Sequence, residues 1–314
     1  MNTSNIRIVS GNSYPDFAKE ISDNLNIPLT LATIKKFSCG ETYVNLEESV
    51  RGKEVFIVQT TRTNMMNEDF MELFILCDAI KRSFAKRIHV VMPYFSYARQ
   101  DKIHQSRESI SARLMASLLE KSGVNRVITV HLHSEQIQGF FSIPVDNINA
   151  KKIFAKVIKK KNIQNPIIVS PDTGGAKNAK KIADELGFPL AILHKTRPGH
   201  NVSEVTHVIG DIANKTPIIF DDMIDTGGSV CEAKNALVNN GANDEVYLVA
   251  THPVFSGPAI ERIKNAGFKE IIVTNTLPLL DNSINCLTTL TIAPLIAEVI
   301  KNTMENKSVS SLYF

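Results

Sequence analysis

The sequence has little cysteine and no long apolar run. Its four cysteines are Cys39, Cys77, Cys231 and Cys286, and no two of them form a CxxC pair. Scattered cysteines in a chain of this size indicate reduced thiols in a cytosolic protein, not a disulfide framework or a zinc site. No apolar run approaches the roughly 20 residues that a membrane-spanning helix needs. The first residues lack the basic stretch and apolar core of a signal peptide, so we expect a cytoplasmic location.

The chain also has little excess charge. Its 35 Lys and Arg face 32 Asp and Glu, which leaves a net charge of +3. Such a balance gives no argument for nucleic acid as a partner, because nucleic-acid-binding domains carry a strong positive excess. Apolar residues make up 43% and charged residues 21% of the chain, as in ordinary globular proteins. At roughly 100 to 200 residues per domain, 314 residues predict two domains.

Short apolar runs rich in β-branched residues recur along the chain, and polar residues do not alternate within them. This pattern is typical of strands that are buried on both faces of a parallel sheet. The runs cover residues 54–60, 87–95, 126–133, 165–172, 216–222, 245–252 and 270–276.

Helical spacing of apolar residues appears between these runs, at residues 67–84, 109–123 and 174–187. Alternating strands and helices predict an α/β fold with mainly parallel sheets, in which ligands bind at the carboxyl ends of the strands. The rhythm breaks near 143–150 and then restarts. We therefore expect two similar domains, 1–148 and 149–304, with the tail 305–314 packed back on the first.

A strand-like segment runs directly into three carboxylates and a Gly-Gly turn in IIFDDMIDTGGSV, residues 218–230. Carboxylates so close together repel one another unless a cation or sugar hydroxyl groups lie between them. A Gly-rich turn at a helix N-terminus presents N–H groups to an anion, and the helix dipole adds roughly 0.3 to 1 kcal/mol. Thr226 and Ser229 can add hydroxyl donors. A sugar phosphate would satisfy both the glycine end and the acidic end of this stretch.

This stretch has two other interpretations. It could be a plain strand-end turn whose polar residues cap the next helix. It could also be a Walker-B-like strand, but that site needs a Walker A loop, GxxxxGK[ST], and the sequence contains none.

The pattern DDxxDTGGS after an apolar strand resembles the phosphoribosyl-diphosphate loop of type I phosphoribosyltransferases and of ribose-phosphate diphosphokinases. Other stretches resemble the second family alone, in the same order and over nearly the whole chain. They are PYFSYARQDK (93–102), HSEQIQGFFSIPVDN (133–147), VSPDTGG (169–175), KTRP (195–198), THPVFSGPAIERI (251–263) and the final SVSSLYF. The resemblance implies two domains of the type I phosphoribosyltransferase-like fold. It also implies transfer of the diphosphate of ATP to the anomeric hydroxyl of ribose 5-phosphate, which yields 5-phosphoribosyl 1-diphosphate and AMP for nucleotide biosynthesis.

The resemblance assigns roles to particular residues. Within the sugar-phosphate loop, the 5-phosphate is expected on the backbone of residues 226–229, and the carboxylates are expected near the ribose hydroxyls and Mg²⁺. That loop comprises Asp221, Asp222, Asp225, Thr226, Gly227, Gly228 and Ser229. His133 and Asp172 resemble residues linked to Mg²⁺, the expected cofactor. Lys195 and Arg197 resemble a catalytic pair on a mobile loop, which would stabilise charge on the transferring phosphates.

Other residues resemble those that bind the nucleotide and regulators. Arg99 and Gln100 resemble an ATP-contacting pair, and Phe37 and Glu41 resemble an adenine-binding segment that reaches a neighbouring subunit. The family implies dimers that build a homohexamer. The residues that resemble a regulatory site for phosphate or ADP at subunit contacts are Ser49, Arg51, Arg82, Ser308 and Ser310.

Several positions depart from the family pattern. Cys39 stands where Asp or Asn is usual, His104 where an acidic residue is usual, and Ser229 where Thr is usual. The remaining departures are His131 for Asp, Thr173 for His and Asn178 for Arg. These changes motivate an alternative hypothesis, a non-catalytic paralogue that regulates an active enzyme. A phosphoribosyltransferase is a third hypothesis, but it has no use for the ATP-like segment around Arg99.

Overall fold

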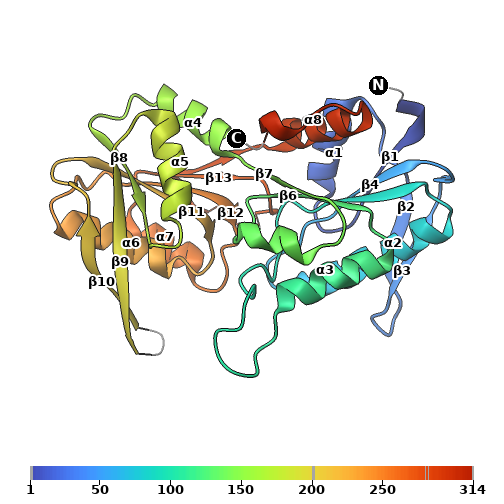
Figure 1. Ribbon diagram of the computed structural model, residues 1–314, viewed down its shortest axis with the longest axis horizontal. Coiled ribbons are helices and arrows are strands. Elements are labelled where there is room, and N and C mark those ends of the chain that lie inside the picture. The colour runs from blue at the N-terminus through green and yellow to red at the C-terminus, as the bar shows by residue number, and fades with distance from the viewer. Residues whose placement is uncertain (1–2, 200–201, 280, 282, 313–314) are drawn as a thin grey trace. The chain divides into compact units, whose positions relative to one another are not determined.

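The computed structural model describes residues 3–199, 202–279, 281 and 283–312, and for residues 3, 195–199, 202–206 and 311 it describes the backbone alone. The chain forms two compact units (Figure 1). The first consists of Met1–Asn149, Thr276–Pro278 and Thr291–Phe314, and the second of Ala150–Asn275 and Leu279–Leu290. Each unit contains a sheet flanked by helices, so the predicted α/β class with mainly parallel sheets is confirmed.

The first unit is built on a five-stranded parallel sheet in the order β1-β4-β5-β6-β7. Its strands are β1 (Ile6–Ser10), β4 (Glu54–Val58), β5 (Arg87–Val91), β6 (Arg126–Val130) and β7 (Val145–Ile148). Its helices are α1 (Pro15–Leu25), α2 (Met66–Arg82), α3 (Ser111–Ser122) and α8 (Ala293–Met304). Short 3-10 turns lie at η1 (Thr3–Asn5), η2 (Glu135–Phe140) and η3 (Ser310–Leu312).

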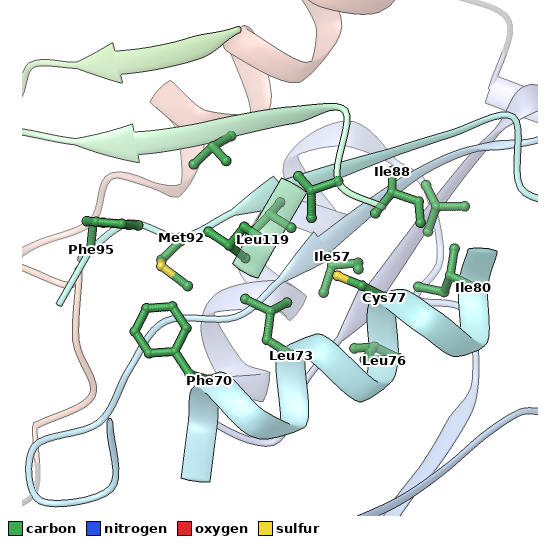
Figure 2. Packing of buried hydrophobic residues seen from close by; sticks show 14 of the residues in the cluster. Ile57, Phe70, Leu73, Leu76, Cys77, Ile80, Ile88, Met92, Phe95 and Leu119 are labelled. Atoms are coloured by element: carbon green, nitrogen blue, oxygen red, sulfur yellow. The ribbon is translucent and has the colours of Figure 1, made fainter. Parts of the chain in front are cut away.

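One face of this sheet packs against α2 and α3. Figure 2 shows Leu73 and Cys77 of α2 directed toward Ile57 of β4, whereas Phe70 at the start of α2 points toward Met92 and Phe95. Every residue of β4 is buried, as expected for a central strand with helices on both faces. On the other side, α1 lies against α8, although the two helices are far apart in the sequence (Figure 1).

The second unit contains a seven-stranded sheet in the order β10-β9-β8-β11-β12-β13-β14, and only the β9–β10 pair is antiparallel. Its strands are β8 (Pro166–Ser170), β9 (Leu190–Gly199), β10 (Val202–Ile209), β11 (Thr216–Ile224), β12 (Tyr247–Pro253), β13 (Glu270–Thr274) and β14 (Leu287–Leu290). Its helices are α4 (Lys151–Lys160), α5 (Ala176–Leu186), α6 (Gly228–Asn239) and α7 (Ala259–Ala266).

The apolar core and the parallel strands of this unit bring several loops to one edge of the sheet. Val230, Ala233 and Leu237 of α6 and Ile263 of α7 pack on buried strand residues such as Ile219. Because β8, β9, β11, β12 and β13 run parallel, their carboxyl ends lie along one edge of the sheet. That edge carries the loops that follow Ser170 and Ile224.

Each apolar run named above overlaps a strand, and each of the three helical segments overlaps a helix. The structure also has elements that the pattern did not reveal, among them β7 and the hairpin of β2 (Ala32–Lys36) and β3 (Thr42–Leu46). The segment expected to be a loop around Lys195 is instead part of β9, which pairs with β10. Pro198 is tolerated there because the pairing of β9 with β8 ends at Ile192, so the last residues of β9 have a partner strand, β10, on one side only.

Candidate active site

Three aspartates lie at and just beyond the carboxyl end of β11. This strand pairs with β8 on one side and β12 on the other, so its apolar residues Ile218 and Ile219 are fully buried. Asp221 and Asp222 are half-buried near the end of the strand, where sheet pairing continues on the β12 side. Asp225 follows the last strand residue and is also half-buried.

The carboxylates at this edge interact strongly. Burial raises the pKa of the Asp221 carboxyl well above its ordinary value, and the negative charges of Asp222 and Asp172 raise it further. The backbone N–H of Asp222 donates to Asp221 Oδ1 at 2.9 Å, which offsets only part of that effect. A cation or hydroxyl donors placed here would relieve the repulsion, as the sequence predicts.

The glycine turn opens helix α6. Gly227 adopts φ 74°, in the left-handed region, and a Cβ there would lie 3.4 Å from the carbonyl oxygen of Ala259. The N–H of Cys231 donates to Gly227 O at 3.1 Å as the helix begins. The first N–H groups of an α-helix have no acceptor within the helix, and in proteins such groups commonly bind anions.

A segment after β12 holds this turn in place. Backbone N–H groups of Phe255 and Ser256 donate to Ile224 O at 2.9 Å and to Asp225 O at 3.0 Å. The Ser256 hydroxyl also donates to Asp225 Oδ1, and Arg262 Nη1 donates to Thr226 O at 3.2 Å. No sequence motif assigned a role to Ser256 or Arg262. Their position after the strand next to β11, within the family-like stretch 251–263, was the available signal.

The loop after β8 lies at the same edge of the sheet. Ser170 Oγ donates to Asp172 O at 2.7 Å, and the Gly175 N–H donates to Asp172 Oδ1 at 2.8 Å. The Asp172 side chain is exposed and stands before the first turn of α5. Asn178, in that turn, accepts a hydrogen bond from Lys151 Nζ at 3.1 Å.

Lys195 and Arg197 lie on β9 beyond Ile192, which pairs with the last residue of β8. Lys195 is opposite Val205 in the β9–β10 pair. Their side chains lie outside the described part of the chain. Because β8 ends opposite Ile192, the part of β9 that carries Lys195 and Arg197 continues past the carboxyl end of β8.

The residues predicted to bind ATP occupy two places in the first unit. Phe37 and Glu41 close the β2–β3 hairpin, where the Phe37 N–H donates to Glu41 O at 2.8 Å. The Phe37 ring is 50% exposed and meets Tyr43 edge-on at 5.5 Å. Its exposure leaves the ring available to a nucleotide base. Cys39, in the same turn, is exposed.

Arg99 and Gln100 lie in the connection between β5 and α3, and both are exposed. The N–H of Gln100 donates to Tyr97 O at 2.9 Å, its carbonyl accepts from Ala112 N at 3.2 Å, and its side chain accepts from Ser111 Oγ. These bonds anchor the turn that carries Arg99 to the start of α3.

His133 and His131 follow β6 in the first unit. His133 is exposed, whereas His131 is buried with φ 47° and donates its N–H to Ile148 O at 2.8 Å. Leu132 N donates to Asn147 Oδ1 at 3.0 Å. The bonds to β7 and to Asn147 fix the backbone from which His133 projects.

The residues expected to form a regulatory site are exposed on the first unit. Ser49 Oγ accepts from the Arg51 N–H at 3.4 Å, and the Arg51 guanidinium lies 4.6 Å from the ring centroid of Phe84. Arg82 pairs with Asp78 one helical turn away at 2.6 Å. Ser308 and Ser310 interact with each other, because Ser310 N donates to Ser308 Oγ at 3.2 Å.

Within the described ranges, no group of three or more His, Cys, Asp or Glu side chains is arranged as a ready-made metal site. This is compatible with Mg²⁺, which keeps several water molecules and commonly binds through one or two carboxylates together with substrate phosphates. The mutual repulsion around Asp221 fits a divalent cation nearby. None of the helices described is long and apolar enough to cross a membrane.

Comparison with protein families matches both ends of the chain. Residues 6–123 match the N-terminal domain of ribose phosphate pyrophosphokinase, and residues 198–314 match the phosphoribosyl synthetase-associated domain. Among solved structures, the phosphoribosylpyrophosphate synthetase from Mycobacterium smegmatis is similar with a TM-score of 0.91 and 43% identity. The match covers 96% of this chain and 99% of that one.

Curated relatives agree over the full length. The ribose-phosphate pyrophosphokinase of Oceanobacillus iheyensis is 49% identical over 311 residues, which are 99% of this chain and 98% of the relative. The ribose-phosphate pyrophosphokinase of Bacillus subtilis is 48% identical over 310 residues, 98% of this chain and 97% of the relative. With the family-like loops in place on an α/β fold, these matches show that the chain belongs to the ribose-phosphate pyrophosphokinase family, also called ribose-phosphate diphosphokinases.

Proposed function

We propose that the loop at the end of β11 binds ribose 5-phosphate in the family's reaction, the transfer of diphosphate from ATP to the anomeric hydroxyl. One observation carries this assignment: carboxylates that repel one another adjoin a glycine turn at the start of α6. The turn supplies N–H groups to the 5-phosphate, and Asp221, Asp222 and Asp225 accept hydrogen bonds from ribose hydroxyls. Thr226, Gly228 and Ser229 complete the phosphate end of the loop.

The ATP side of the site is proposed to include Arg99 and Gln100, with Phe37 and Glu41 at the adenine. Exposure of the Phe37 ring and the anchored turn at Gln100 support this role. We assign residues 1–148, with the tail 305–314, to the ATP side and residues 149–304 to the ribose 5-phosphate side, except α8 (Ala293–Met304), which packs against α1 in the first unit.

Mg²⁺ is proposed as the cofactor, with Asp172 and His133 as residues that would hold it directly or through water. When bound, it would neutralise charge on the triphosphate and draw electron density from the phosphorus under attack. The Gly175 N–H and the Ser170 hydroxyl, which hold the loop of Asp172, keep one of its carboxylate oxygens in a defined place.

Lys195 and Arg197 are proposed to place positive charge on the bridging and leaving oxygens of ATP as diphosphate is transferred. A donor pre-positioned for charge that develops in the transition state typically lowers the barrier by about 2.7 to 4 kcal/mol. Such residues act most strongly when water is excluded. The β9–β10 hairpin extends past the carboxyl end of β8, on the side of the sheet that carries the proposed site.

The assembly and regulation are further proposals. We propose a cytoplasmic homohexamer built from dimers, in which Phe37 and Glu41 serve a neighbouring subunit. A regulatory phosphate or ADP would bind Ser49, Arg51, Arg82, Ser308 and Ser310. All the side chains of this set that the structure describes are exposed, as an intersubunit ligand site requires before assembly.

The assay that tests the reaction is AMP release from ATP, ribose 5-phosphate and Mg²⁺. Purified folded protein should form AMP only when all three are present, and no AMP under any condition would refute the proposal. Lys195→Ala should lower turnover at least about 100-fold while ribose 5-phosphate still binds, because the lysine acts on the transferring phosphates. Loss of ribose 5-phosphate binding in that variant would instead place Lys195 on the sugar phosphate.

A further inference from the structure

Arg262 lies directly beside the glycine turn of the proposed sugar-phosphate loop. Its Nη1 donates to Thr226 O at 3.2 Å and lies 3.5 Å from the position that a Cβ on Gly228 would occupy. Gly228 is the first residue of α6, so the guanidinium borders the N-terminus of that helix. The arginine comes from α7, whose Ala259 also lies against Gly227.

Within the described part of the chain, no salt bridge neutralises the charge of Arg262. Among the residues described, it has no carboxylate partner, and its side-chain hydrogen bond goes to the neutral carbonyl of Thr226. An arginine has five N–H donors in a rigid plane, so one bond leaves most of them for another acceptor. The Arg262 side chain is exposed.

The proposed sugar-phosphate loop and its ligand bring several negative charges together, and the Arg262 guanidinium can offset part of that charge. Asp221, Asp222 and Asp225 place negative charge a few residues from the turn, and a sugar phosphate brings up to two more negative charges. Backbone N–H groups and hydroxyls carry only partial positive charge. A guanidinium at the turn supplies a full positive charge in the geometry that matches phosphate oxygens.

We propose that Arg262 is a further ligand of the 5-phosphate of ribose 5-phosphate, held in place by its bond to the Thr226 carbonyl. The inference rests on the proposed role of residues 226–229. One guanidinium nitrogen fixes the side chain to the loop, and the remaining donors bind the phosphate oxygens. Arg262 therefore contributes to affinity for the phosphorylated sugar and has no direct contact with ATP.

The test measures binding of ribose 5-phosphate to the full-length protein by calorimetry, without ATP, together with the KM values of both substrates. Arg262→Ala should weaken ribose 5-phosphate binding about tenfold or more, because hydrogen bonds to charged groups are strong, and leave the KM of ATP unchanged. Arg262→Gln keeps an N–H donor for Thr226 but has no charge, and it should lose a similar amount. Arg262→Lys, which keeps the charge without the planar fork, should recover part of the affinity.

Lys264→Ala is the matched control. Lys264 is an exposed cation on the same helix, and its Nζ bonds to Ser283 Oγ at 2.6 Å, away from the loop. It should bind ribose 5-phosphate as the wild type does, so that a general loss of positive charge from α7 is separated from loss of this ligand.

Two results would overturn the inference. If Arg262→Ala binds ribose 5-phosphate as tightly as Lys264→Ala, the arginine is no ligand. If Arg262→Gln binds like the wild type, the residue only braces the Thr226 carbonyl. Both results differ from failure of the proposed function, in which the wild type itself would not bind ribose 5-phosphate or would bind it and release no AMP. Melting temperatures of all variants show that each is folded.

Discussion

At the scale of single residues, the proposed sugar site depends on groups that hold its ligands as much as on the ligands themselves. Asp225 follows a strand and has no helix or sheet to fix its side chain. Its backbone carbonyl and its carboxylate both accept hydrogen bonds from Ser256, through the N–H and the hydroxyl. A carboxylate held in this way loses less conformational freedom when it accepts a ribose hydroxyl.

Ser256→Ala should therefore raise the KM of ribose 5-phosphate, by about tenfold, and leave the KM of ATP unchanged. Ser256→Thr retains the hydroxyl and should restore most of the lost affinity. Steady-state kinetics with each substrate varied in turn measures both constants. Ser283→Ala, on an exposed serine elsewhere in the same unit, is the control. An equal rise in both KM values would show that Ser256 supports the fold and not the position of Asp225.

Gly227→Ala tests the turn itself. Gly227 has φ 74°, a backbone conformation that is strained for alanine. A Cβ added there would also lie 3.4 Å from the carbonyl oxygen of Ala259 in α7. We expect a loss in the free energy of unfolding of more than about 1 kcal/mol and a KM for ribose 5-phosphate raised about tenfold or more.

Gly241→Ala is the matched control for this change. Gly241 has φ 88°, but an added Cβ would meet nothing within 4 Å. It should lose only the backbone term of about 1 kcal/mol, measured by urea unfolding, with unchanged kinetics. Identical kinetics for the two variants would contradict a special role for the turn at Gly227.

At the scale of secondary structure, two neighbouring strands of the first unit's sheet bury a polar pair. His89 of β5 and Glu54 of β4 are both buried, and His89 Nε2 lies 2.8 Å from Glu54 Oε2. The histidine ring stacks on Phe56 at 4.4 Å, and its Nδ1 has no partner among the described residues. This arrangement fits a neutral histidine that donates through Nε2, because a proton on Nδ1 would be buried without an acceptor.

The buried His89–Glu54 pair predicts that the free energy of unfolding decreases at low pH. Burial lowers the pKa of His89 despite the hydrogen bond and charge of Glu54. For Glu54, burial alone would raise the pKa, but hydrogen bonds from His89 and Lys86 leave it lowered. In both cases the unfolded chain binds protons more readily than the folded chain. The free energy of unfolding is therefore highest above the ordinary histidine pKa of about 6.5 and decreases as the pH falls below it, with a further loss below about 4.3.

Replacing His89 by Gln, which cannot titrate but keeps a donor for Glu54, should flatten the decrease between about pH 7.5 and 5.5. We expect the difference between the two profiles to be about 1 kcal/mol, measured by urea unfolding at several pH values. His104→Gln removes an exposed histidine and should leave the wild-type profile unchanged. A profile for His89→Gln parallel to the wild type would show that this histidine does not control the acid loss.

At the scale of the whole molecule, the proposed site draws residues from both halves of the sequence. The family matches extend over both ends of the chain, and relatives with the same activity align along nearly all of it. The chain is therefore a diphosphotransferase, an enzyme of the ribose-phosphate pyrophosphokinase family. Departures such as Cys39 and Asn178 do not remove it from that family.

Mixed assemblies test whether Phe37 completes the site of a neighbouring subunit. Phe37→Ala and Lys195→Ala should each be weakly active alone. If the two variants are unfolded and refolded together, a subunit with an intact lysine can receive an intact phenylalanine from its neighbour. Random mixing should then restore about one quarter of the sites, measured as AMP release. Activity no higher than the mean of the two separate variants would place Phe37 in the same subunit as the Lys195 that it serves.

Local pattern was enough to predict much of the fold and the centre of the candidate site. Runs of β-branched residues without polar alternation, such as 54–60, are typical of strands buried between two layers of helices. The structure has a strand in each of these runs, as expected. The residues predicted to bind the sugar phosphate all lie within nine consecutive positions, from 221 to 229. The short strands β2, β3 and β7 gave weaker patterns because they are only partly buried.

The sequence by itself determined the class of the fold, the sugar-phosphate motif and the family to which it points, because these depend on residue type and on spacing along the chain. Only the tertiary structure decided which distant groups hold that motif. Ser256 is 31 positions from Asp225, and Arg262 is 36 positions from Thr226. They meet because β11 and β12 are neighbours in a parallel sheet, which brings the loops after both strands to one edge.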